Sequence, residues 1–129
     1  MDNISKKIVA IDDDTTILEY LKMALTNLGY EFFGYDSAER GIDAVEKEKP
    51  ALILLDVMLP DMDGLTVCRK LKSKPSVANV PIIMLTSLTD AATIQNAHLY
   101  GAVDFLPKPF ELQVLKSKIE KALSKRPKA

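Results

Sequence analysis

The chain has 129 residues, with 17 basic and 18 acidic side chains and a net charge of −1. This length supports one ordinary domain with a single core, and the balanced charge argues against a surface built to bind nucleic acid. One cysteine, Cys68, excludes an internal disulfide and fits a reducing cytosol. No apolar run approaches the roughly 20 residues of a membrane span, and residues 1–7 lack the apolar segment of a secretory signal. We expect a cytoplasmic domain that binds neither nucleic acid nor membrane directly.

Short apolar segments alternate with longer amphipathic stretches, which is typical of a parallel sheet covered by helices. The segment 52–55 is the most hydrophobic and is expected at the centre of the sheet, whereas 31–35 is less uniformly aliphatic and is expected nearer an edge. The expected strands are 8–11, 31–35, 52–55, 81–85 and 102–106.

Apolar residues at helical spacing predict a helix after each strand. Thr15 or Thr16 is expected to cap the first helix, which Gly29 stops, and Ser37 is expected to cap the second. The third follows a loop at 58–64. The fourth and fifth are expected at 90–100, with a Gly101 stop, and at 111–123.

Five strand–helix units in right-handed crossovers predict a doubly wound α/β fold. The core is expected at 6–123 of a single domain 1–129, with 124–129 as a tail or the start of a linker. In such sheets ligands gather at the carboxyl ends of the strands. The polar residues that follow the strands are Asp12, Asp13, Asp14, Asp56, Thr86, Ser87 and Lys108.

These residue types suit phosphoryl transfer. Crowded carboxylates repel one another unless a cation intervenes, and Mg²⁺ accepts carboxylates, a backbone carbonyl and waters as ligands. Lys108 supplies a compact positive charge for phosphate, and Thr86 supplies a hydroxyl donor. An aspartate can accept a phosphoryl group, and the transfer itself depends mainly on positioning and charge neutralisation. The set is chemically complete without a histidine base.

Four motifs, in this order and spacing, resemble the response-regulator receiver family of two-component signalling, which includes chemotaxis regulators. The similarity extends from about Lys6 to about Leu123. It implies a flavodoxin-like fold with five helices around a parallel sheet of order 2-1-3-4-5. It also implies a phosphoacceptor that promotes its own phosphorylation and dephosphorylation rather than a turnover enzyme. The motifs are Ile11-Asp12-Asp13, Asp56-Val57-Met58-Leu59-Pro60-Asp61-Met62-Asp63-Gly64, Met84-Leu85-Thr86-Ser87 and Lys108-Pro109-Phe110.

Carried over by position, the resemblance implies that Asp56 accepts the phosphoryl group. Asp13, and Asp12 through water, would hold Mg²⁺ (or Mn²⁺) together with Asp56 and the backbone carbonyl of Met58. In this family the positions of Met58 and Leu88 flank the route of the attacking water. The apolar side chains at these two positions predict slow self-dephosphorylation.

The resemblance further implies that Thr86 and Lys108 contact the phosphoryl oxygens and that Phe105 swings inward on activation. Phe105 lacks the hydroxyl that many members carry there as tyrosine. The bond between Lys108 and Pro109 is expected to be cis. The donor would be a histidine kinase or a histidine phosphotransfer protein. The face built from the fourth helix, fifth strand and fifth helix would then engage a downstream protein or output domain. Homodimerisation on phosphorylation is compatible with the pattern, although no residue requires it.

Two alternatives remain open. A haloacid-dehalogenase-like phosphatase would use Asp12 as nucleophile and Asp14 as acid/base, but the chain lacks the later metal-binding stretch and leaves Asp56 unexplained. A phosphorylation-independent interaction module would work through its surface alone.

Other polar residues have ordinary structural explanations. Asp14 is expected to cap a helix or face solvent, and Asp61 and Asp63 to form turns, with Asp63 also a candidate cap for the third helix. Cys68 is expected in the core. His98 is expected to be an ordinary histidine on a helix.

Overall fold

The computed structural model describes residues 6–87 and 91–124. Outside this part lie the predicted role of Leu88, the predicted start of the fourth helix at Asp90 and most of the predicted tail. Five parallel strands form one sheet in the order β2-β1-β3-β4-β5. The predicted fold class and strand order are confirmed, with β3 central and β2 at an edge. The strands are β1 (Lys7–Ile11), β2 (Glu31–Tyr35), β3 (Leu52–Asp56), β4 (Ile82–Thr86) and β5 (Asp104–Pro107).

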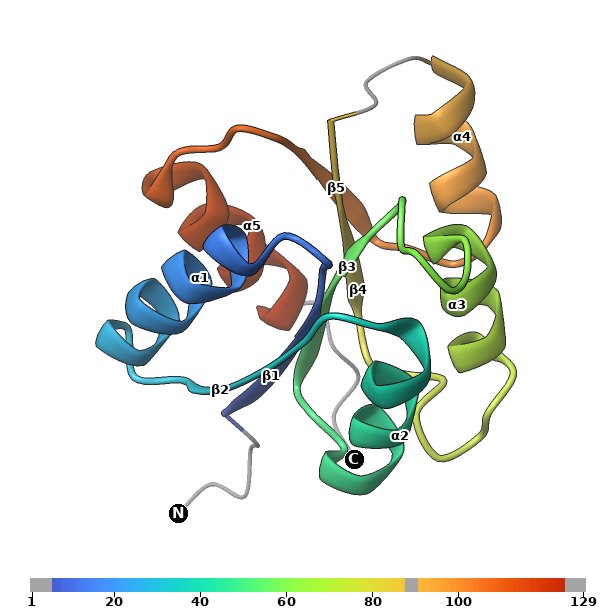
Figure 1. Ribbon diagram of the computed structural model, residues 1–129, viewed down its shortest axis with the longest axis horizontal. Coiled ribbons are helices and arrows are strands. Elements are labelled where there is room, and N and C mark those ends of the chain that lie inside the picture. The colour runs from blue at the N-terminus through green and yellow to red at the C-terminus, as the bar shows by residue number, and fades with distance from the viewer. Residues whose placement is uncertain (1–5, 88–90, 125–129) are drawn as a thin grey trace.

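Helices cover both faces of the sheet, with α1 and α5 on one side and α2, α3 and α4 on the other (Figure 1). Alternate residues of β1 enter the two cores, because successive side chains of a strand point to opposite faces. Val9 and Ile11 join the cluster under α2, α3 and α4, whereas Ile8 and Ala10 join the one under α1 and α5. The helices are α1 (Thr15–Asn27), α2 (Ala38–Glu48), α3 (Gly64–Lys72), α4 (Ala91–Leu99) and α5 (Leu112–Ser124).

Helix α1 begins at Thr15, so its N-cap lies one residue before the first of the two predicted caps. Asp14, not Thr15 or Thr16, is the N-cap residue of α1, and its carboxylate accepts hydrogen bonds from the amides of Thr16 and Ile17. A carboxylate satisfies two amides that a helix start leaves without partners. The predicted cap of α2 is confirmed, since the Ser37 side chain accepts from an amide of the first turn.

Two glycines end helices as predicted, with positive φ angles of 94° at Gly29 and 105° at Gly101. The last strand starts later than predicted. The Ala102 amide donates to the carbonyl of Ala97 and thereby closes the end of α4, so β5 begins only at Asp104.

The parallel register brings the carboxyl ends of the strands to one edge. Ile11 pairs with Leu55, and Thr86 pairs with Pro107. The residues that end or directly follow β1, β3, β4 and β5 therefore meet at this edge, as a parallel sheet predicts. Among the residues that the structure describes, no helix is long and apolar enough to cross a bilayer.

Candidate functional site

Three carboxylates meet at the carboxyl ends of β1 and β3. One oxygen each of Asp12, Asp13 and Asp56 lies within 4.8 Å of the other two. Asp12 is fully buried, Asp56 is 7% exposed and Asp13 is exposed. The neighbouring strands β1 and β3 thus bring together the three acidic residues that the sequence singled out.

Lys108 reaches this acidic group from the end of β5. Its Nζ lies 2.7 Å from Asp12 Oδ2 and 3.4 Å from Asp56 Oδ2. Burial alone lowers the pKa of the ammonium, but the carboxylates of Asp12 and Asp56 raise it overall, so Lys108 stays charged. The Lys108 amide donates to the Thr86 carbonyl at 2.8 Å, which ties the residue to β4. The predicted cis bond to Pro109 is confirmed.

The surroundings of Asp56 raise the pKa of its carboxyl group. Burial, followed by the charge of Asp12, raises its pKa from 3.8 to about 6. The Lys108 ammonium and the Met58 amide act in the opposite direction. Because three carboxylates share one ammonium, the negative charge of the group is only partly compensated.

The donor set fits a hard divalent cation. Asp12 Oδ2 is enclosed and, within the described residues, accepts no directed hydrogen bond beside its ion pair with Lys108. The available donors are carboxylate and backbone oxygens, which Mg²⁺ prefers to nitrogen or sulfur. An enclosed oxygen in a group whose negative charge is only partly compensated is the kind of ligand that such an ion binds.

The loop 57–63 is held to β3 and α3 by short contacts. The Met58 amide donates to Asp56 Oδ1 at 3.3 Å, and Met58 forms an isolated antiparallel bridge with Asp63. The Gly64 amide donates to the Val57 carbonyl at 2.7 Å. A Cβ atom on Gly64 would overlap the Asp56 carbonyl, so this crossing requires glycine. The Asp63 carboxylate caps α3 as predicted.

The Met58 side chain is 62% exposed at this edge of the sheet. Its backbone amide, which donates to Asp56 Oδ1, joins the residue to the acidic group. The second residue predicted to flank the route of attacking water, Leu88, lies outside the described residues.

The proposed switch residues lie on β4 and β5. Of the two neighbouring hydroxyl residues at the end of β4, Thr86 is buried and Ser87 is exposed. Phe105 is half-buried, with Lys118 Nζ 5.4 Å from its ring centroid. The same ammonium pairs with Asp104 at 2.9 Å. The ring is thus covered by a lysine of α5 rather than fully enclosed by the core.

Asp61 has a contact that the sequence did not predict. Its Oδ1 accepts from the Ala38 amide at 2.9 Å and its Oδ2 from the Glu39 amide at 3.2 Å. These amides, chiefly that of Ala38, lower the pKa of the Asp61 carboxyl. No local pattern predicts the contact, because its partners are 22 and 23 residues away in the sequence.

Three further predictions concern residues away from the acidic group. Cys68 is buried as predicted, its Sγ donates to the Tyr100 carbonyl at 3.3 Å, and burial raises the pKa of its thiol to about 11. A thiol of this kind is inert at neutral pH. His98 is exposed on α4. Asp14 is engaged as the α1 cap.

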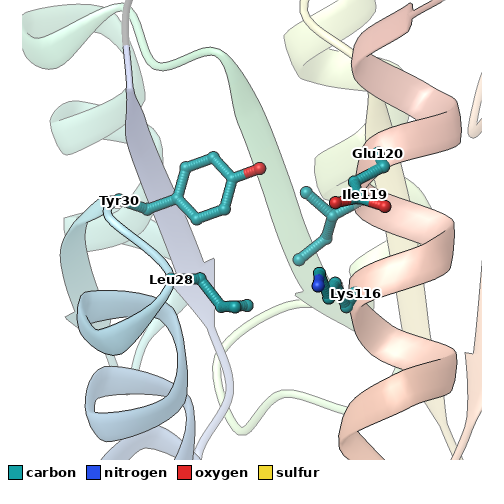
Figure 2. Close-up of a pocket in the computed structure, with 5 residues that line it drawn as sticks. All are labelled: Leu28, Tyr30, Lys116, Ile119 and Glu120. Carbon is teal, nitrogen blue, oxygen red and sulfur yellow. The ribbon is translucent and has the colours of Figure 1, made fainter.

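A small pocket lies between α5 and the start of β2 (Figure 2). Its volume is about 50 Å³, room for a few water molecules. Tyr30 precedes β2, so the pocket is at the amino end of the sheet, opposite the acidic group. Its lining residues are Leu28, Tyr30, Lys116, Ile119 and Glu120.

Comparison with known proteins gives a consistent result. Residues 8–120 match the family model of the response regulator receiver domain. The chain is 36% identical over 128 residues to a probable transcriptional regulator, ycf27, of Porphyra purpurea, covering 99% of this chain and 51% of that protein. The chain therefore spans about half the length of such curated relatives.

Solved structures are similar over nearly their whole length. A putative response regulator from Chloroflexus aurantiacus has a TM-score of 0.89 at 33% identity, covering 94% of this chain and 99% of that one. The BeF3-activated N-terminal receiver domain of RstA from Klebsiella pneumoniae has a TM-score of 0.85 at 31% identity, covering 91% and 97%.

Proposed function

The chain belongs to the response regulator receiver domain family of two-component signalling, and from this premise we propose that it is a switch activated by phosphorylation of Asp56. One observation carries the proposal. Buried Asp56 lies among Asp12, Asp13 and Lys108 at the edge of the sheet where parallel strands present their ligands.

In the proposed reaction, an Asp56 carboxylate oxygen attacks phosphorus, and the bond from phosphorus to the donor breaks. The donor is a phosphohistidine of a histidine kinase or phosphotransfer protein, or a small phosphodonor. The Lys108 ammonium offsets charge on the phosphoryl oxygens, and the Thr86 hydroxyl donates to one of them. When bound, Mg²⁺ or Mn²⁺ would be held by Asp12, Asp13, Asp56 and the Met58 carbonyl and would supply further positive charge.

The proposed output runs from Thr86 to Phe105. Movement of Thr86 toward the phosphoryl group vacates space for the half-buried ring, which then leaves Lys118. This is a shift between two populated states rather than a new fold. Exposed apolar side chains of α4, α5 and the segment before β5 suit a partner surface across α4, β5 and α5. They are Leu99, Val103 and Val114.

The proposed partners and location rest on membership of the family. The similar protein ycf27 is a probable transcriptional regulator about twice as long as this chain, so the proposed target is an output domain or a downstream protein. The proposed location is the cytoplasm, and homodimerisation on phosphorylation is compatible with the face just described.

We assign 6–123 to the receiver core and 124–129 to a tail or the start of a linker. The apolar side chains of Met58 and Leu88 predict that the phosphoryl group on Asp56 is hydrolysed slowly.

The alternatives are less well supported. In a dehalogenase-like phosphatase Asp14 would be the acid/base, but its carboxylate caps α1. A phosphorylation-independent module would not need the pairing of Lys108 with buried Asp12 and Asp56.

Intact-mass spectrometry after incubation with acetyl phosphate and Mg²⁺ tests the proposal. We expect a gain of one phosphoryl group in the wild type, and no gain in Asp56→Asn or after metal chelation. The BeF3-activated state of the RstA receiver domain suggests beryllofluoride as a second probe. If the wild type failed to respond to acetyl phosphate, to a kinase donor and to beryllofluoride, the proposed switch would be rejected. The phosphorylation-independent interaction module would then be the supported function.

A further inference from the structure

The Asp61 carboxylate joins the loop 57–63 to the first turn of α2. A helix start leaves several amides without partners inside the helix. In α2 the first two, of Ala38 and Glu39, are satisfied by Asp61, and only the third, of Arg40, is satisfied by the helix's own cap, Ser37, at 3.4 Å. The start of α2 is therefore capped mainly by a residue from another part of the chain.

Helix α2 is in turn seated on the strand that leads to the acidic group. A Cβ atom on Gly41 would overlap the Ile11 side chain, so the helix and the end of β1 are in close contact. Ala38 and Val45 share a buried cluster with Ile11. Ile11 directly precedes Asp12, so the position of α2 bears on the position of this carboxylate.

The other end of the connection is the loop itself. Asp61 lies between Met58 and Asp63, which form a bridge across the loop, and Met58 also donates to Asp56. The contact from Asp61 to α2 therefore links the loop that follows β3 to the helix that packs on β1. These two strands carry the two halves of the acidic group.

We propose that Asp61 is a positioning residue that fixes the separation between Met58 and the Asp12–Asp13 pair. The role rests on the proposed function, since it matters only if this group binds a cation. A carboxylate suits it, because each oxygen accepts from a different amide and the positive end of the helix dipole favours its charge. An asparagine offers one acceptor oxygen and an alanine offers none.

NMR titration of the apo protein with Mg²⁺ tests this role. We expect Asp61→Asn to weaken Mg²⁺ binding roughly threefold and Asp61→Ala on the order of tenfold, the lower end of what residues supporting metal ligands contribute. The amides of Ala38 and Glu39 should exchange faster with solvent in both variants. The readout is the dissociation constant and the exchange rates, so no phosphorylation is required.

Two controls separate positioning from a general loosening of α2. Ser37→Ala removes the internal cap of the same helix end, and Asp43→Asn removes an exposed α2 carboxylate. Both should bind Mg²⁺ as the wild type does. Equal weakening in Ser37→Ala would overturn the role of Asp61, and so would unchanged affinity in Asp61→Asn. If the wild type bound no Mg²⁺, the proposed function itself would fail first and this inference with it.

Discussion

Helices α3 and α4 have the same length and lie on the same face of the sheet, yet they are packed very differently (Figure 1). Each has nine residues. In α3 five residues are buried, whereas Ala97 alone is buried among the α4 side chains that the structure describes. Leu99 of α4 is 78% exposed. The sheet is therefore held firmly by one helix and only lightly by the other.

The difference in burial between α3 and α4 matches the different roles proposed for the two regions. Helix α3 and the loop 57–63 flank the acidic group, where phosphoryl transfer requires fixed geometry. Helix α4 packs beside β5, the strand that carries Phe105, where a signal requires movement. Elements that move are drawn from the least stable part of a fold, because local opening there costs little. The comparison predicts that α3 and the loop 57–63 are rigid, and that α4 and β5 change conformation on phosphorylation.

A matched pair of leucine substitutions gives the largest expected effect. Leu71 of α3 is fully buried, so Leu71→Ala should lower the free energy of unfolding by roughly 3 kcal/mol through loss of packing. Leu99→Ala should stay within about 0.5 kcal/mol of the wild type, since exposed side chains contribute little. Urea denaturation measures both. Similar losses in the two variants would remove the contrast between the helices.

A smaller effect should come from burying Asp56. Its pKa rises from 3.8 to about 6 on folding, so between these values the folded state binds a proton that the unfolded state has lost. The free energy of unfolding of the metal-free protein should therefore fall as pH rises from about 4 to about 6, by on the order of 1–2 kcal/mol. Denaturation in chelator across this range measures it. Asp56→Asn should remove the decrease and be the more stable protein at pH 7. A decrease that persists in this variant would assign it to other groups.

Much of the fold was predictable from the sequence, because its signals are local. The apolar run before Asp56 predicted a central strand, and the turn glycines Gly29 and Gly101 predicted helix ends. The acidic group was predictable too, since parallel strands align the residues that follow them. Their positions at the carboxyl ends of β1, β3 and β5 are enough to bring Asp12, Asp56 and Lys108 together.

Other features depend on distances that a sequence does not contain. Thr15, Thr16 and Asp14 were all acceptable caps for α1, and only the backbone path selects Asp14 among them. Asp61 had the composition of a turn, but its carboxylate reaches a helix that ends well before it in the chain. The light packing of α4 was also hidden, because a helical pattern does not say how closely the helix approaches its sheet.

Hydrogen exchange measured by mass spectrometry, with and without Mg²⁺ and beryllofluoride, tests the central claim most directly. In the resting protein we expect faster exchange in α4 than in α3, and after activation we expect the largest change in 91–107, with α3 nearly unchanged. Occupancy of Asp56 is checked by the absence of a response in Asp56→Asn. An equal change in α3, or no change in 91–107 at full occupancy, would contradict the account of a fixed acidic half coupled to a mobile output half.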